Sequence, residues 1–356
     1  MFEVPLHIGV ASGGLMVGLA FGALAWRTQF CIVGSLYSAV AADDDRGLRA
    51  VYLAMATAII LAQVLVSFGL IDVDKSIYRG ATLHWAGAVL GGVLFGHGMV
   101  KANGCGSGSL VNLGGGDLRS LIVLLIFGLF AYMTLHGLTA IPRVALENWA
   151  DLDLAGVGFV GQGLDQIVGA FFGVDPETLR WPMALAVSAA ILTYVFRSEA
   201  FCQSPRHVAS GIGVGAIIAL GWYVTGHLGD DPFEPTRVGS LTFALPIGET
   251  ILYAVTFTGS TINFGIGAVI GVALGSALVA RWRGEYRLQY PEGDKDLVDG
   301  ILGGAMMGVG GVFAFGCTVG NGLSGISVLS IGAMLAWVAI MAGGHWSAGR
   351  KFVITD

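Results

Sequence analysis

The chain consists mainly of apolar runs of the length that crosses a bilayer, each ended by a short polar break. A membrane-spanning helix needs about 20 mostly apolar residues. By this measure the sequence predicts nine spans, and a further apolar piece at Ile247–Thr258 leaves a tenth open. The nine predicted spans are Ile8–Trp26, Leu48–Leu70, Leu83–Val100, Ser120–Gly137, Pro182–Phe196, Val208–Val224, Ile262–Ala280, Gly300–Phe315 and Ile326–Gly343.

Composition supports a membrane protein and excludes an ordinary soluble domain. Hydrophobic residues make up 55% of the chain and charged residues only 12%, against about 25% charged in typical soluble proteins. Glycine is the second anomaly, with 57 of 356 residues. In membrane helices glycine permits close backbone packing and interrupts helices where a site is needed. We therefore expect an all-α, polytopic bundle with some broken helices, embedded in a lipid bilayer.

The distribution of charge predicts the orientation of the bundle. The net charge of −6 and the absence of long Lys/Arg blocks argue against nucleic-acid partners. Cytoplasmic loops of membrane proteins carry an excess of Lys and Arg, so the richest basic loop and the C-terminus are expected in the cytoplasm. The side of the N-terminus depends on the span count and stays open. The basic residues concerned are Arg281, Arg283, Arg287 and Lys295 in the loop, and Arg350 and Lys351 near the C-terminus.

The chain is expected to form one transmembrane transport domain, residues 1–356, made of two repeat halves. The halves cover about 1–140 and 181–356 and are joined by a loop at 141–180. Two stretches of mixed polarity, Leu138–Arg180 and Gly226–Gly248, are open to interpretation as surface loops, amphipathic helices or shallow re-entrant pieces.

An internal repeat relates residues 91–110 to residues 303–322 at a constant offset of 212. Seven identities occur without a gap, and both copies end in Gly-Cys-x-x-Gly. Internal repeats with broken helices at corresponding positions indicate a transport site near the membrane midplane. The identical pairs are Gly91/Gly303, Gly92/Gly304, Gly96/Gly308, Gly98/Gly310, Gly104/Gly316, Cys105/Cys317 and Gly108/Gly320.

The two remaining cysteines match each other in their position after a span. Cys31 follows Arg27-Thr-Gln-Phe30 at the end of the first span, and Cys202 follows Arg197-Ser-Glu-Ala-Phe201 at the end of the fifth. This match predicts that Cys31 and Cys202 are equivalent, while the role of Cys202 stays open.

The Gly-Cys turns are expected to begin short half-helices that enter the membrane and return. The apolar stretch after Cys105 is too short to cross, because Gly114-Gly-Gly-Asp117 follows it closely, and the stretch after Cys317 is similar. A half-helix N-terminus offers free N–H groups and a positive dipole end, which favour an anion. Gly104, Gly106 and Gly316 would let the backbone approach that anion, with φ values at Gly104 and Gly316 that other residues resist.

Cysteine suggests the chemistry of the anion, because its sulfur is polarizable and its S–H is a weak donor. These properties suit a sulfur-bearing anion better than phosphate. Lys101, four residues before Cys105, faces either this anion or the membrane interface. Zinc ligation is not indicated, because the chain has no Cys-x-x-Cys or His-x(3–5)-His pair.

At this point the residues carry a resemblance. The Gly-Cys-x-x-Gly turns at 104–108 and 316–320, with Phe30-Cys31 after the first span, resemble the YeeE/YedE family of sulfur transporters over nearly the whole chain. The family implies an hourglass-shaped, multi-pass protein of the bacterial inner membrane with about nine spans. It also implies that thiosulfate passes a central constriction by successive S–H···S hydrogen bonds to cysteine thiols.

Carried over to this sequence, the family pattern implies a substrate site at Cys31, Cys105 and Cys317. A small cytoplasmic sulfurtransferase of the TusA type is the implied partner, and no cofactor, metal or catalytic residue is expected. The alternatives are transport of another sulfur or selenium species, or a membrane-embedded sulfurtransferase. An enzyme of that kind needs a basic group near its cysteine, and Lys101 is the one candidate close in sequence to the two Gly-Cys turns.

Overall fold

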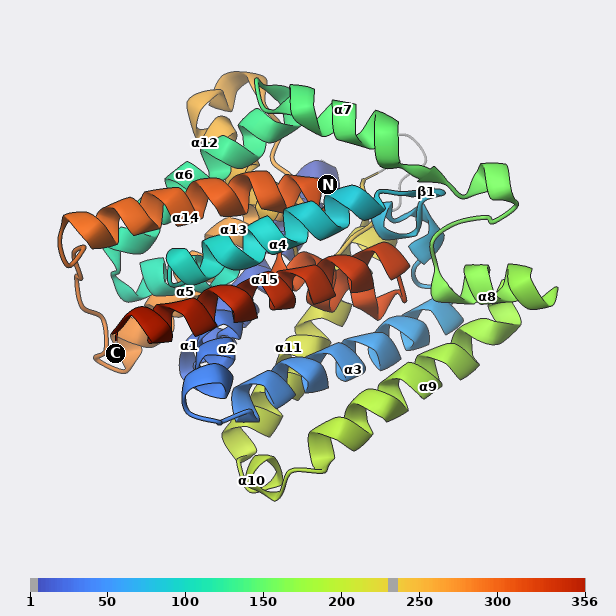
Figure 1. Cartoon of the computed structure of the whole chain (residues 1–356), viewed down its shortest axis with the longest axis horizontal. Helices are drawn as coiled ribbons and strands as arrows, with labels where there is room; N and C mark the ends of the chain where they lie inside the picture. The colour runs from blue at the N-terminus through green and yellow to red at the C-terminus, as the bar shows by residue number, and fades with distance from the viewer. Residues whose placement is uncertain (1–5, 230–235, 356) are drawn as a thin grey trace, which may run out of the picture.

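The computed structural model describes residues 6–229 and 236–355, and these residues are almost entirely helical (Figure 1). The two short strands, β1 (Thr82–Leu83) and β2 (Leu152–Asp153), pair antiparallel outside the helical bundle. The expectation of an all-α bundle is confirmed.

Long helices form the body of the molecule, and short helices lie between them. The long helices are α1 (Leu6–Thr28), α3 (Arg46–Ser67), α4 (Trp85–Lys101), α6 (Leu118–His136), α9 (Pro176–Phe196), α11 (Pro205–Tyr223), α13 (Phe264–Trp282), α14 (Asp294–Phe313) and α15 (Ile331–Thr355). The short helices are α2 (Ile32–Ala41), α5 (Gly106–Gly115), α7 (Ala140–Ala150), α8 (Leu164–Phe172), α10 (Glu199–Cys202) and α12 (Ala244–Val255). Single turns are η1 (Val73–Lys75), η2 (Ile77–Arg79), η3 (Ala155–Val157) and η5 (Phe257–Gly259), and the π-helical segments are η4 (Val224–Leu228) and η6 (Gly320–Gly325).

Eight of the described helical segments are long and apolar enough to cross a membrane. Each overlaps most of one predicted span. The remaining predicted span is α4, which has only 17 residues. The uncertain tenth piece is the 12-residue helix α12, which is too short to cross a bilayer on its own.

Three predicted spans start five or six residues away from the start of their helix. One of them is Gly300–Phe315, whose helix α14 begins at Asp294. The fifth span begins at Pro176 rather than Pro182, because Asp175 caps the helix and Pro182 is tolerated inside it. The last span begins at Ile331 rather than Ile326, since residues 318–327 form a separate short helical segment that contains η6. The first stretch of mixed polarity, Leu138–Arg180, contains the two short helices α7 and α8. In the second, Gly226–Gly248, residues 230–235 lie outside the described part of the chain.

The short helices recur at the 212-residue offset of the sequence repeat. Helix α2 corresponds to α12, α4 to α14, and α5 to the segment 318–327. The packing of the long helices follows the same relation. Helix α1 packs against α13, and the corresponding pair is α11 and α3. Helix α4 packs against α15, and the corresponding pair is α14 and α6. The two halves are therefore interlocked rather than placed side by side.

This correspondence corrects the match of Cys31 with Cys202. The residue 212 positions after Cys31 is Phe243, which stands immediately before α12 as Cys31 stands before α2. Cys202 instead ends the short helix α10 and is exposed to the surroundings. The sequence match failed because a phenylalanine occupies the equivalent position, so no identity marked it.

Glycines allow the two halves to approach closely where they interlock. A methyl group on Gly18 of α1 would lie 2.3 Å from the carbonyl oxygen of Ala268 in α13. Gly271 in α13 would likewise contact the Leu15 carbonyl at 2.3 Å. Distances this short leave no room for a side chain, so helix packing requires glycine at these positions.

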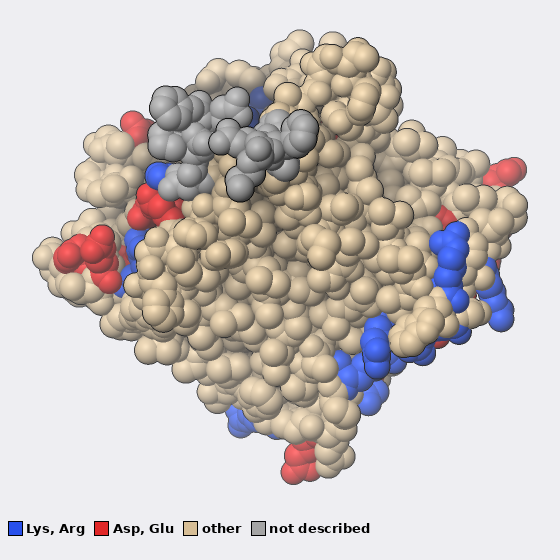
Figure 2. Space-filling view, turned by 180° about the vertical axis from the view of Figure 1, so that it is seen from behind, with Lys and Arg blue, Asp and Glu red and all other residues tan. Residues whose placement is uncertain are grey.

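Charge is confined to the edges of the face in Figure 2. Its broad central area carries no Lys, Arg, Asp or Glu side chain, and Lys and Arg gather along the lower right edge. Because Figure 2 is turned by 180° about the vertical axis, this lower right edge is the side on which Figure 1 shows the C-terminus, at the lower left. This pattern agrees with a lipid-facing belt and with the expected cytoplasmic side.

Candidate functional site

The three predicted site cysteines follow one common backbone turn. Two residues before each cysteine, the chain adopts left-handed φ values of 54° to 57°. The next N–H then closes the end of the preceding helix by bonding to a carbonyl five residues earlier, as Gly104 does to Met99 at 2.9 Å and Gly316 to Gly311 at 2.9 Å. This is the hydrogen bond of a Schellman helix end. The left-handed residues are Gln29, Asn103 and Phe315.

The left-handed positions correct one expectation about the glycines. Neither Gly104 nor Gly316 is among the described residues with positive φ; the preceding residues Asn103 and Phe315 carry that conformation instead. The glycines matter for space. A methyl group on Gly104 would lie 3.0 Å from Ser109 Oγ, and one on Gly316 3.1 Å from the Asn321 side chain.

Each cysteine stands directly before a short helical segment. Cys31 caps α2, and its sulfur accepts the Gly34 N–H at 3.3 Å. Cys105 precedes α5, and Cys317 precedes the segment 318–327. The short helices after the Gly-Cys turns were predicted from sequence, whereas α2 was not. Three helix N-termini with positive dipole ends thus meet at three free thiols.

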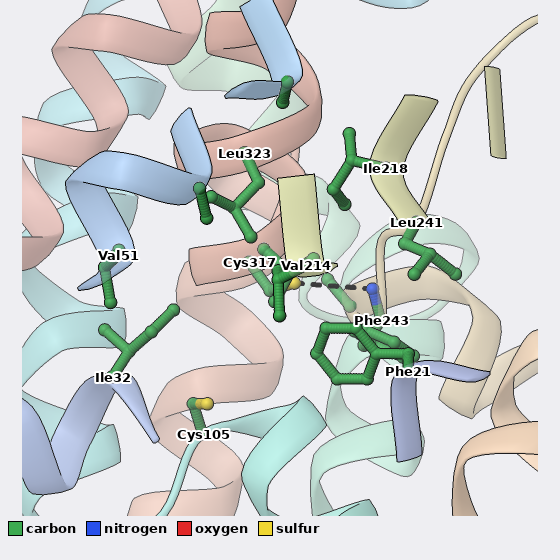
Figure 3. Packing of buried hydrophobic residues seen from close by; sticks show 14 of the residues in the cluster. Phe21, Ile32, Val51, Cys105, Val214, Ile218, Leu241, Phe243, Cys317 and Leu323 are labelled. Carbon is green, nitrogen blue, oxygen red and sulfur yellow. Dashed lines mark hydrogen bonds between the residues drawn. The ribbon is translucent and has the colours of Figure 1, made fainter. Parts of the chain in front are cut away.

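The sulfurs of Cys31 and Cys105 lie close together. Gly108 lies beside both: a methyl group there would be 3.6 Å from Cys105 Sγ and 3.9 Å from Cys31 Sγ. Cys105 is also the electrostatic neighbour of Cys317. Figure 3 shows Cys105 below Cys317, with Ile32 on one side and Phe21 and Phe243 on the other. Cys105 therefore lies between the other two cysteines.

Among the three cysteines, Cys317 has the most hydrogen bonds to its sulfur. Its sulfur accepts the N–H of Phe243 at 3.4 Å, drawn as the dashed line in Figure 3, and the N–H of Gly320 at 3.4 Å. With these two donors on its sulfur, the Cys317 S–H is left to donate to a third group. The sulfur of Cys105 has one hydrogen-bond partner, the hydroxyl oxygen of Ser107 at 3.3 Å.

A cavity of about 300 Å³ opens beside Cys31. Its wall includes Thr28, Ser35, Ser38 and His207. The cavity lies at the end of α1 that contacts the basic loop, where the Trp26 indole donates to Glu285 at 2.9 Å. Cys31 is therefore reached from the expected cytoplasmic side, whereas Cys105 and Cys317 are only 1% exposed.

The other predicted site residues are placed differently. Gly106 packs tightly, because a methyl group there would lie 2.7 Å from the Phe127 ring and 3.5 Å from Phe243 Cβ. The Lys101 ammonium pairs with Asp299 at 2.8 Å. This ion pair ties α4 to α14 and satisfies the positive charge with a carboxylate.

An ion-pair cluster that the sequence reading missed supports the Cys317 segment from the other end. Arg79 and Asp165 are 1% and 0% exposed and form a bidentate pair at 2.7 and 2.8 Å. Arg79 also donates to the Val328 carbonyl at 2.9 Å, just after residues 318–327. Burial alone would raise the pKa of Asp165, but Arg79 and Arg180 hold it below its ordinary value. Arg79 and Asp165 are far apart in the sequence, so no local motif could reveal this ion-pair cluster.

The fold and the site define a multi-pass membrane protein whose two interlocked halves enclose three thiols. A family model described as sulphur transport matches residues 27–346. The chain therefore belongs to this family, the YeeE/YedE sulfur transporters, and the predicted resemblance is confirmed.

Two relatives extend the comparison over nearly the full chain. A protein of Spirochaeta thermophila named thiosulfate transporter TsuA is 25% identical over 94% of this chain and 96% of its own length. A protein of Escherichia coli with the same name is 26% identical over 94% of this chain and 92% of its own.

Proposed function

We propose that the protein takes up thiosulfate through a constriction lined by Cys317, Cys105 and Cys31. The observation that carries the proposal is the meeting of three free thiols at three helix N-termini inside the bundle. The names of both relatives support thiosulfate as the substrate.

The order of the cysteines gives the path a direction. Cys317 neighbours Tyr78 in the loop between α3 and α4, on the side opposite the basic loop. Cys105 follows, and Cys31 borders the cavity on the basic side. If the basic side is cytoplasmic, the anion meets Cys317, Cys105 and Cys31 in that sequence.

The thiols act as hydrogen-bond donors to the terminal sulfur of thiosulfate. Each sulfur already has a neighbouring N–H or hydroxyl group that fixes its orientation. The S–H of each cysteine then points its proton toward the passing anion, which moves from one thiol to the next without a covalent bond. Among the described residues, no Lys, Arg or His nitrogen hydrogen-bonds to these three sulfurs, which favours transport over nucleophilic catalysis.

The same proposal includes the cellular setting. We place the protein in the bacterial inner membrane, with the Cys31 cavity facing the cytoplasm. A TusA-like sulfurtransferase is the proposed recipient of the thiosulfate sulfur there.

Labelled thiosulfate uptake into proteoliposomes that contain only this protein tests the function. We expect uptake that unlabelled thiosulfate suppresses and that sulfate and selenite suppress less. The exposed Cys202 provides the matched control, since Cys202→Ala removes a thiol outside the proposed path. Uptake that is indifferent to thiosulfate but blocked by selenite would overturn the substrate assignment.

A further inference from the structure

A pair of hydroxyl groups lies beside Cys317, in a place that the cysteine relay does not use. The hydroxyls belong to Tyr78 in η2 and Thr242 before α12. Both converge on Gly320, where a methyl group would lie 2.5 Å from Thr242 Oγ1 and 3.1 Å from Tyr78 Oη. The N–H of Gly320 in turn donates to Cys317 Sγ. The hydroxyls and the thiol therefore surround one glycine.

The Tyr78 hydroxyl is buried without a hydrogen bond of good geometry. Tyr78 is 5% exposed, and its oxygen finds no partner within the described part of the chain, although Thr242 lies next to it. A buried, unpaired hydroxyl destabilises a protein, so proteins retain one where something else supplies the partner. The ring is held in place from behind by an edge-on contact with Trp222, at 6.5 Å between centroids.

The other half of the repeat lacks these hydroxyls. At the equivalent glycine, Gly108, a methyl group would meet only the sulfurs of Cys105 and Cys31 within 4 Å. The two turns share their backbone but differ in what borders the glycine: sulfur alone beside Gly108, and hydroxyl oxygens beside Gly320. A thiosulfate ion has the same two kinds of surface: a terminal sulfur and three oxygens.

We infer that Tyr78 and Thr242 form a subsite that binds the oxygens of a sulfur oxoanion while the Cys317 thiol faces its terminal sulfur. The inference rests on the proposed function and adds a reason why the protein would select an anion that carries oxygen. A site built to hydrogen-bond an oxygen discriminates strongly against a ligand that lacks it, because the buried Tyr78 hydroxyl is then left unpaired. The subsite thus selects the anion at Cys317, before the sulfur-lined turn.

Tyr78→Phe and Thr242→Val test this subsite, because each removes the hydroxyl and keeps the size of the side chain. The matched controls are Tyr194→Phe and Thr193→Val on α9, a helix that carries none of the three site cysteines. The readouts in proteoliposomes are the KM for labelled thiosulfate and the inhibition constant of hydrosulfide, an anion without oxygen. We expect each site variant to raise the thiosulfate KM roughly tenfold, the effect of one lost hydrogen bond, and to leave inhibition by hydrosulfide unchanged.

The outcomes separate this inference from the proposed function. An unchanged KM in both site variants, with normal uptake by the wild-type protein, would reject the subsite alone. Equal losses toward thiosulfate and hydrosulfide would also reject it, because a general distortion of the turn acts on both anions. A wild-type protein that neither takes up thiosulfate nor gains Tm in its presence would reject the proposed function, and the subsite with it.

Discussion

The sulfur of Cys105 has fewer neighbours that hold it than the sulfur of Cys317. Two backbone N–H groups approach Cys317, whereas Cys105 contacts one hydroxyl, that of Ser107. Cys105 also lies between the other two cysteines, so every path through the three thiols includes it. These facts make Cys105 the most informative single residue of the proposed relay.

We expect Cys105→Ala to abolish thiosulfate uptake while the protein remains folded in the membrane. The change removes the S–H donor and leaves a small cavity, for which a loss of about 1 kcal/mol in stability is typical. Cys317→Ala and Cys31→Ala should also impair uptake severely, and Cys202→Ala should be mild. Uptake per inserted molecule is the measurement, and retained uptake in purified Cys105→Ala protein would contradict the relay.

The turns before the short helices depend on residues in a left-handed conformation. Asn103 has φ of 54° and is exposed, so its side chain can be changed without disturbing the interior. Asparagine tolerates this conformation, whereas a β-branched residue does so at a cost of about 1–2 kcal/mol. This turn sets the position of Cys105 only two residues later.

Asn103→Val should therefore lower Tm and reduce uptake together, because the strained turn displaces the start of α5. Asn103→Gly is the matched control and should retain both, since glycine adopts positive φ freely. Thermal unfolding in detergent and uptake in proteoliposomes give the two values. Equal behaviour of the valine and glycine variants would show that the turn does not constrain the site.

The short segment 318–327 is held at its far end by the buried pair of Arg79 and Asp165. Asp165→Ala leaves the Arg79 charge buried without its main partner, which typically costs 3–5 kcal/mol. Glu177, which is exposed in the first turn of α9, offers the control Glu177→Ala with little expected effect. Because the Asp165 pKa is depressed, the pair stabilises the fold above the ordinary aspartate pKa of about 4 and is lost only as pH falls below it. Comparable Tm values for both variants at pH 7 would contradict this role.

Sequence patterns predicted the helices better than the connections between them. Each predicted span is a helix because apolar runs of that length have one stable form in lipid. The Gly-Cys turns were recognisable because both copies kept glycine and cysteine. The sequence did not reveal the roles of Phe243, Tyr78 and the partners of Arg79. Each of these residues acts through contacts between distant parts of the chain, which leave no local sequence motif.

At the scale of the whole molecule, glycine-lined seams join the two halves. The α1–α13 seam recurs between α3 and α11, where a methyl group on Gly211 would lie 2.8 Å from the Ala50 carbonyl. Because each seam joins helices from both halves, neither half has a complete packing surface alone.

Gly18→Val should prevent stable assembly, because its side chain would collide with the Ala268 backbone. Gly9→Val on the same helix should be tolerated, since nothing lies within 4 Å of a methyl group there. The yield of monodisperse protein after extraction measures the difference. Similar yields for the two variants would show that the α1–α13 contact accommodates a larger side chain.

The meeting of three helix N-termini at the centre has a bioenergetic consequence. Helices α2 and α5 and the segment 318–327 all begin there, so their positive dipole ends add rather than cancel. In the proposed route, hydronium, sodium and potassium ions would face an electrostatic barrier at the place where the anion is stabilised. A cell could then keep such a route permanently in its energised membrane without dissipating the proton-motive force, and we expect liposomes containing the protein to hold a pH gradient as long as empty ones.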